Sequence, residues 1–157
     1  MEIVMAVEEG KKAPNFNLIG SDGSKHKLAD YKGKWVVLYF YPKDDTPGCT
    51  KQACGFRDLK KQYEKLDVEI IGVSPDETHD AFISKYQLPF TLLSDPKKKV
   101  MEVYGAWGEK NMYGKKTIGV IRSTTIIDPQ QKVAKHYKRV PKAEAHPEKV
   151  LEWIAGQ

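Results

Sequence analysis

WVVLYFYPKDDTPGC, residues 35–49, is the stretch that says most about the fold of this 157-residue chain. Residues 35–41 are continuously apolar, aromatic or β-branched, which predicts a strand covered on both faces. A turn is expected at residues 42–45. Thr46 followed by Pro47 is a helix-start signal, with threonine as the N-cap and proline at the first helical position. We therefore predict a buried strand, a turn, and a helix from Pro47 to about Leu66.

Strand-like and helix-like segments alternate along the rest of the chain. Strands are predicted at residues 68–73, 90–93, 118–127 and 132–138, and helices at 77–86, 97–104 and 148–155. The polar residues at 107–110 and 113–116 predict a loop. This alternation indicates a central sheet with helices packed on its faces, and it leaves the order and direction of the strands open.

Length and composition indicate a single soluble domain. A chain of this length, with 40% hydrophobic and 30% charged residues, can bury one core without disulfide bonds, so we expect one domain over residues 1–157. The longest apolar run, residues 35–41, is too short to span a bilayer, and we expect no membrane partner. The N-terminus lacks the basic flank and long apolar stretch of a secretory signal. We expect a cytoplasmic protein.

The net charge of +5 comes from 26 Lys and Arg against 21 Asp and Glu, and it is spread along the chain. The densest basic run, residues 97–99, is short, whereas nucleic-acid-binding proteins gather basic residues into a patch or stripe. We interpret the excess as a solvated, lysine-rich surface and expect no nucleic-acid partner.

The chain has two cysteines, Cys49 and Cys54, only five residues apart. In a reducing compartment such a close pair is typical of catalysis or metal binding, not of a structural disulfide. Zinc would need a second pair of ligands, which the spacing does not supply. The four histidines are scattered and are interpreted as surface or turn residues: His26, His79, His136 and His146.

Cys49 is the third residue of the predicted helix. The free N–H groups and the dipole of a helix N-terminus favour negative charge, and the thiolate is the reactive form of cysteine. The Thr46 hydroxyl is close enough to bond the backbone N–H or the sulfur of Cys49. Pro42 has no N–H, so it can form a wall beside the sulfur without competing for its charge. The pattern predicts a nucleophilic thiolate, and the alternative is a small buried core cysteine.

Cys54 and Arg122 complete the set of candidate residues. On a helical wheel Cys54 lies nearly opposite the apolar stripe that contains Cys49, which suits a thiol that must reach an oxidised partner and later be reduced by another protein. Arg122 lies in the strand predicted at residues 118–127, on its apolar face. An arginine there needs an anion, and a thiolate on the adjoining helix would provide one. The guanidinium could also hold a peroxide oxygen. The alternative is a snorkelling arginine at a sheet edge.

These residues resemble the peroxiredoxin family, in the subgroup of the bacterioferritin comigratory protein and plant peroxiredoxin Q. The family's Pro-x-x-x-Thr-x-x-Cys signature is matched by Pro42, Thr46 and Cys49, and the subgroup's second cysteine is matched by Cys54. Gln52 stands where many bacterial members have glutamate, with no expected catalytic consequence. Further matches are Leu88-Pro89-Phe90, Leu93-Ser94-Asp95 and Arg122-Ser123-Thr124.

The resemblance implies a thioredoxin-like fold of the α/β class, with a central mixed β-sheet flanked by α-helices. It implies that Cys49 is the peroxidatic cysteine, which becomes a sulfenic acid, and that Cys54 is the resolving cysteine. Pro42, Thr46 and Arg122 would frame the pocket.

The implied substrate is a hydroperoxide and the implied reductant is thioredoxin or a similar dithiol, with no metal, haem or flavin required. We expect a monomer. Two other functions stay open. A thiol–disulfide reductase would be expected to carry Cys-x-x-Cys after the first strand, and this chain has none. A metal chaperone would need a third ligand near the cysteine pair.

Overall fold

The computed structural model describes residues 7–112 and 114–157. Residues 1–6, part of the N-terminus in which no secretory signal was predicted, and Tyr113, which was expected in a loop, lie outside the described residues. In chain order the elements are β1 (Asn17–Gly20), β2 (Lys25–Lys27), the 3-10 helix η1 (Leu28–Tyr31), β3 (Trp35–Phe40), α1 (Pro47–Asp58), α2 (Lys60–Lys65), β4 (Val68–Ser74), α3 (Asp80–Tyr86), β5 (Thr91–Ser94), α4 (Lys99–Val103), β6 (Trp107–Met112), β7 (Lys115–Val120), β8 (Ser123–Ile127), β9 (Val133–Tyr137) and α5 (His146–Ala155).

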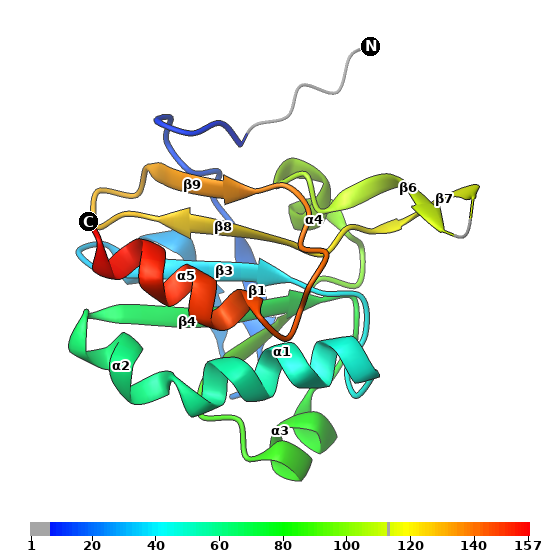
Figure 1. The fold of residues 1–157 in the computed structure, drawn as a ribbon, viewed down its shortest axis with the longest axis horizontal. Helices are drawn as coiled ribbons and strands as arrows, with labels where there is room; N and C mark the ends of the chain where they lie inside the picture. The colour runs from blue at the N-terminus through cyan, green and yellow to red at the C-terminus, as the bar shows by residue number, and fades with distance from the viewer. Residues whose placement is uncertain (1–6, 113) are drawn as a thin grey trace.

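Seven strands form one mixed sheet in the order β2-β1-β5-β4-β3-β8-β9 (Figure 1). β3, β4 and β5 run parallel to one another, and the outer pairs are antiparallel. The strand predicted from residue 35 is β3, near the middle of the sheet. Its side chains are buried on both faces, and residues 36–40 are at most 1% exposed. The prediction of a central mixed sheet with helices on its faces is confirmed.

The two faces of the sheet carry separate cores because side chains alternate along β3. Val37 and Tyr39 face α1, α2, α3 and α5, which lie in front of the sheet in Figure 1. Leu38 and Phe40 face η1 and α4 on the other side. The start of α1 therefore lies beside the C-terminal end of β3. Among the described helices, none is both long and apolar enough for a membrane span.

Most predicted elements occur with small shifts at their ends. The helix predicted from Pro47 to about Leu66 is divided into α1 and α2, because the backbone leaves the α conformation at Leu59. The sequence reading missed β1, β2 and η1. These elements are short and β1 and β2 are largely exposed, so they lack the apolar pattern on which the prediction depends.

The prediction of one strand over residues 118–127 is wrong. β7 ends at Val120 and pairs with β6, whereas β8 begins at Ser123 and pairs with β3 and β9. At the bend between them, the Ile121 N–H donates to the Ala106 carbonyl at 2.7 Å and the Arg122 carbonyl accepts from the Val140 N–H at 2.9 Å. The polar loop predicted at residues 107–110 and 113–116 is largely wrong, because residues 107–110 lie in β6 and residues 115–116 in β7. These two strands form a ribbon that projects beside the main sheet (Figure 1).

Candidate active site

Cys49 lies in the first turn of α1, as the sequence predicts. Thr46 is the N-cap residue with an extended backbone, Pro47 occupies the first helical position, and the Thr50 N–H closes the turn on the Thr46 carbonyl at 2.8 Å. The Cys49 side chain is only 1% exposed. The Cys49 sulfur lies near the positive end of the helix dipole and away from bulk water. Burial matters here because the field of the dipole is screened less at a buried position.

The Thr46 hydroxyl does not bond Cys49, so that part of the prediction is wrong. It donates instead to the Lys43 carbonyl at 2.9 Å. This bond closes the turn between β3 and α1, because it links two residues on either side of the turn's tip. Thr46 therefore shapes the turn from which Cys49 projects.

Arg122 reaches Cys49 from the bend between β7 and β8. Its Nη2 lies 3.1 Å from the Cys49 sulfur, and its Nη1 donates to Gln52 Oε1 at 2.5 Å. The partner of Arg122 is thus the Cys49 sulfur, although the strand geometry used to predict the contact is wrong. The contact places a positive charge directly beside the sulfur.

Gln52 was given no role from the sequence, yet it is fully buried and holds Arg122. It lies three residues after Cys49, so both side chains project from the same side of α1. This three-residue spacing is the signal in the sequence that places Gln52 beside Cys49. The Gln52 amide is neutral, and it orients the guanidinium without cancelling its charge.

Gly48 gives Arg122 the space to make this contact. A Cβ atom at Gly48 would lie 3.2 Å from Arg122 Nη2, closer than nine in ten real Cβ contacts. Any larger residue would therefore press on the guanidinium that faces Cys49.

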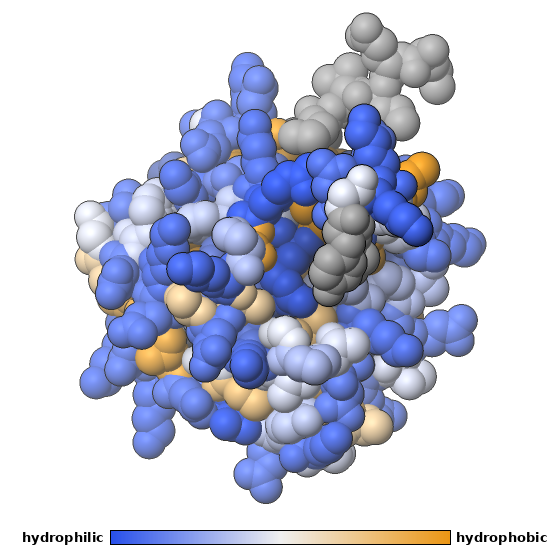
Figure 2. Space-filling model, turned by 45° about the vertical axis from the view of Figure 1, so that its right-hand side comes forward, coloured by the Kyte–Doolittle hydropathy of each residue, from blue (hydrophilic) through white to orange (hydrophobic). Residues whose placement is uncertain are grey.

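A pocket of about 530 Å³ opens beside Arg122. Figure 2 shows the molecule turned so that its right-hand side in Figure 1 comes forward, with a hollow near the centre of the view that has blue, hydrophilic residues within it. The pocket combines apolar walls with basic side chains and includes the predicted Pro42. The residues that line it are Pro42, Lys110, Asn111, Val120, Ile121, Arg122, Arg139, Val140 and Pro141. It offers room beside the guanidinium for a molecule larger than hydrogen peroxide.

Cys54 lies on the less buried side of α1, whereas Cys49 faces the core, and both thiols are free. The helical-wheel prediction of opposite sides agrees with this placement. Gly55 packs closely on α5, since a Cβ there would lie 2.8 Å from Pro147 Cγ. The C-terminal half of α1 is thus tied to α5.

Two histidines that were predicted to be surface or turn residues are buried. His146 Nε2 lies 2.8 Å from Thr124 Oγ1, behind Arg122. Burial, followed by the positive charges of Lys149 and Arg122, lowers the pKa of His146 to about 4, so its ring is neutral at physiological pH. The second, His79, lies under the turn at residues 42–46.

Comparison with known proteins identifies the family of this chain. Residues 9–136 match the AhpC/TSA family. The peroxiredoxin Bcp of Bacillus subtilis is 49% identical over 138 residues, which are 87% of this chain and 88% of the relative.

Two solved structures show the same fold. Peroxiredoxin Q of Xanthomonas campestris has a TM-score of 0.84 at 36% identity and covers 90% of each chain. A variant of PrxQ from Xylella fastidiosa has a TM-score of 0.88 at 33% identity and covers 96% of each chain. The thioredoxin-like fold is confirmed, and this chain belongs to the AhpC/TSA family as a peroxiredoxin of the Bcp and Q type.

Proposed function

We propose that Cys49 attacks the peroxide and that Cys54 resolves the oxidised sulfur. Peroxiredoxins are thiol-dependent peroxidases, and membership makes this chain one of them, in place of a thiol–disulfide reductase or a metal chaperone. The observation that supports the assignment to Cys49 is the 3.1 Å contact between its sulfur and Arg122 Nη2 at the start of α1.

The first step is a substitution at a peroxide oxygen. The Cys49 thiolate forms an S–O bond to the terminal oxygen as the O–O bond breaks, and the alkoxide or hydroxide that leaves takes up a proton. The sulfur becomes a sulfenic acid. Arg122 is placed to donate hydrogen bonds to the oxygens while charge moves from sulfur to the leaving oxygen. Pro42 lines the pocket and adds no competing donor on its backbone nitrogen.

The second step regenerates the enzyme through a disulfide. The Cys54 thiolate attacks the Cys49 sulfur, an S–S bond forms as the S–O bond breaks, and the hydroxide that leaves takes up a proton to become water. A dithiol then reduces the disulfide in two exchange reactions, and we propose thioredoxin or a similar protein for this role. The less buried side of α1 on which Cys54 lies supports the proposal, because the reductant must reach a sulfur there.

We propose hydrogen peroxide and organic hydroperoxides as substrates. The pocket beside Arg122 supports the larger ones. A solved structure of the bacterioferritin comigratory protein of Xanthomonas campestris, 36% identical, is described through its alkyl peroxide reduction activity. We also propose one domain over residues 1–157 that works as a cytoplasmic monomer, because both cysteines lie on one helix and the reductant belongs to a reducing compartment.

Two cysteine variants test the assignment. Cys49→Ser should lose peroxidase activity with thioredoxin as reductant. Cys54→Ser should consume about one equivalent of peroxide and then stall or become overoxidised to sulfinic acid. Peroxide consumption over time and the mass of the protein measure these outcomes. Equal initial burst rates for Cys49→Ser and the unaltered protein would overturn the proposal.

A further inference from the structure

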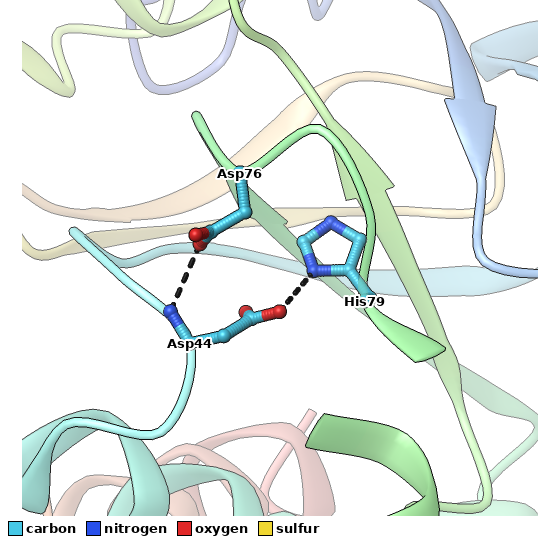
Figure 3. Close-up of side chains that lie close together, drawn as sticks. All are labelled: Asp44, Asp76 and His79. Carbon is cyan, nitrogen blue, oxygen red and sulfur yellow. Dashed lines mark hydrogen bonds and ion pairs between the residues drawn. The ribbon is translucent and has the colours of Figure 1, made fainter. Parts of the chain in front are cut away.

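A partly buried polar cluster lies beneath the turn that leads into α1 (Figure 3). It contains Asp44 from the turn, Asp76 from the loop after β4, and His79, which immediately precedes α3. His79 is 2% exposed, and the Asp44 side chain is 13% exposed. The mechanism above uses none of these residues, although Asp44 lies between Pro42 and Thr46.

Asp44 is held from three directions. Its Oδ1 accepts from the Tyr41 hydroxyl at 2.6 Å, its Oδ2 lies 2.7 Å from His79 Nδ1, and its backbone N–H donates to Asp76 Oδ2 at 2.9 Å. Asp76 Oδ2 also accepts from the Ser74 hydroxyl at 2.7 Å. The turn is therefore fastened both to the end of β3 and to the segment that joins β4 to α3.

The His79 ring faces oxygen acceptors at both of its nitrogens. Nε2 lies 3.0 Å from the Leu93 carbonyl, which can only accept, and Nδ1 faces the Asp44 carboxylate. A neutral ring has one protonated nitrogen, so one lone pair would face an oxygen at hydrogen-bond distance. Both contacts are satisfied when both nitrogens carry protons and the Asp44 carboxylate is ionised. The geometry indicates a buried imidazolium–carboxylate pair.

We propose that His79 is a positioning residue for peroxide reduction, whose doubly protonated ring holds Asp44 and thereby the turn that sets the position of Cys49. The inference rests on the proposed role of Cys49. Loss of one ring proton would replace a hydrogen bond with two facing lone pairs, and the turn would loosen. A buried pair of this kind is costly to break, because the remaining charge is left without a partner.

Several charged and polar groups surround the His79 ring. Asp44 faces it from the turn, and Tyr41 and Asp76 lie behind Asp44. Glu77 and Asp80 flank it along the chain and line the same surface pocket. Ligand atoms of Asp44, Asp76 and His79 lie within 4.8 Å of one another, a spacing that a metal ion could use. Each residue is already engaged by hydrogen bonds within the cluster, which favours positioning.

Nitrogen-15 NMR of histidine-labelled protein tests the protonation state without any activity measurement. The His79 signals, assigned by their loss in His79→Gln, should show two protonated ring nitrogens at neutral pH, with N–H protons that exchange slowly. An unprotonated ring nitrogen at neutral pH would overturn the proposal, whatever the role of Cys49.

The kinetic test measures the oxidation of Cys49 by hydrogen peroxide, between about pH 6 and 9, in the Cys54→Ser background. His79→Gln and Asp44→Asn should each slow this step roughly five- to tenfold at neutral pH, and both should change its pH profile in the same way. The double variant should be no slower than either single variant, because both substitutions remove the same contact between His79 and Asp44.

Asp45→Asn is the matched control. It changes the same residue type in the same turn, but its carboxylate is exposed and bonds Lys85 and Tyr86 instead of His79. Its rate profile should match that of the parent. If His79→Gln lowers the melting temperature but keeps the parental pH profile, His79 is only structural and the inference is refuted. If the Cys54→Ser parent does not react with peroxide at all, the proposed role of Cys49 is refuted, and with it the inference that rests on that role.

Discussion

Formation of a disulfide between Cys49 and Cys54 should unwind the first part of α1. Both cysteines lie within this one helix. Residues five apart in an α-helix are separated by a rise of about 7.5 Å and a rotation of about 140°, which places their Cα atoms about 8.6 Å apart. A disulfide spans no more than about 7 Å between Cα atoms without backbone movement. The two Cα atoms must therefore move at least about 1.6 Å closer together. The two sulfurs, which project from different sides of the helix, must also turn toward each other.

The unwinding should begin at the N-terminal end of α1. Oxidation removes the thiolate from the 3.1 Å contact with Arg122, which holds the first turn. The other end is anchored more firmly, because Phe56 is fully buried and Gly55 packs on Pro147. We therefore expect residues 47–54 to unfold locally while residues 55–58 stay helical.

Amide hydrogen exchange followed by mass spectrometry measures this change. Peptides that cover residues 50–54 should exchange at least about tenfold faster in the disulfide form than in the reduced form, since their helical hydrogen bonds are lost. A Cys54→Ser protein treated with one equivalent of peroxide is the control for oxidation without a disulfide. Equal protection in the reduced and disulfide forms would refute the reasoning, and so would a reduced protein in which α1 is already open.

Three further predictions concern single residues around the site. Arg122→Met should slow peroxide attack and thiol alkylation at neutral pH roughly ten- to hundredfold, because it removes a charged donor from the sulfur; the pH dependence of the alkylation rate measures this. Gly48→Ala should also slow attack, since the added methyl group would lie 3.2 Å from Arg122 Nη2, while thermal unfolding shows the fold unharmed. The pKa of His146 is about 4 when folded and near 6.5 when unfolded, so the unfolded chain binds the proton first as pH falls. Stability should therefore drop by as much as about 3 kcal/mol between about pH 6.5 and 4, and urea unfolding of His146→Gln should lack this loss.

Local signals account for the parts of the site that the sequence predicts correctly. The strand β3, the Thr46-Pro47 helix start and the place of Cys49 in the first turn depend on residues that are adjacent in the chain. The helical wheel, which also depends on local sequence alone, predicts that Cys54 lies away from the side of the helix that contains Cys49. Each of these features follows from backbone preference and helical geometry, which need no knowledge of tertiary contacts.

Features that depend on distant pairing were missed or misread. Arg122 was placed on a continuous strand, but the bend that directs it is produced by backbone bonds to Ala106 and Val140. Gln52 meets Arg122 across 70 residues of chain, and His79 meets Asp44 across 35. The sequence around Gln52 and His79 does not indicate which distant residue each of them contacts. Buried polar contacts of this kind appear only when the elements are packed together.

The active-site segment is held at two places that respond differently to catalysis. Arg122 holds the first turn of α1 through the Cys49 sulfur, and we expect this contact to be strongest with the thiolate of the proposed mechanism. His79 holds the preceding turn through Asp44, and we expect this pair to persist when Cys49 is oxidised, because it does not include the Cys49 sulfur. Conversion of the thiolate to a neutral sulfenic acid therefore weakens the first attachment and leaves the second intact. The helix is released only after peroxide has reacted, while the turn keeps the place to which Cys49 returns once the disulfide is reduced.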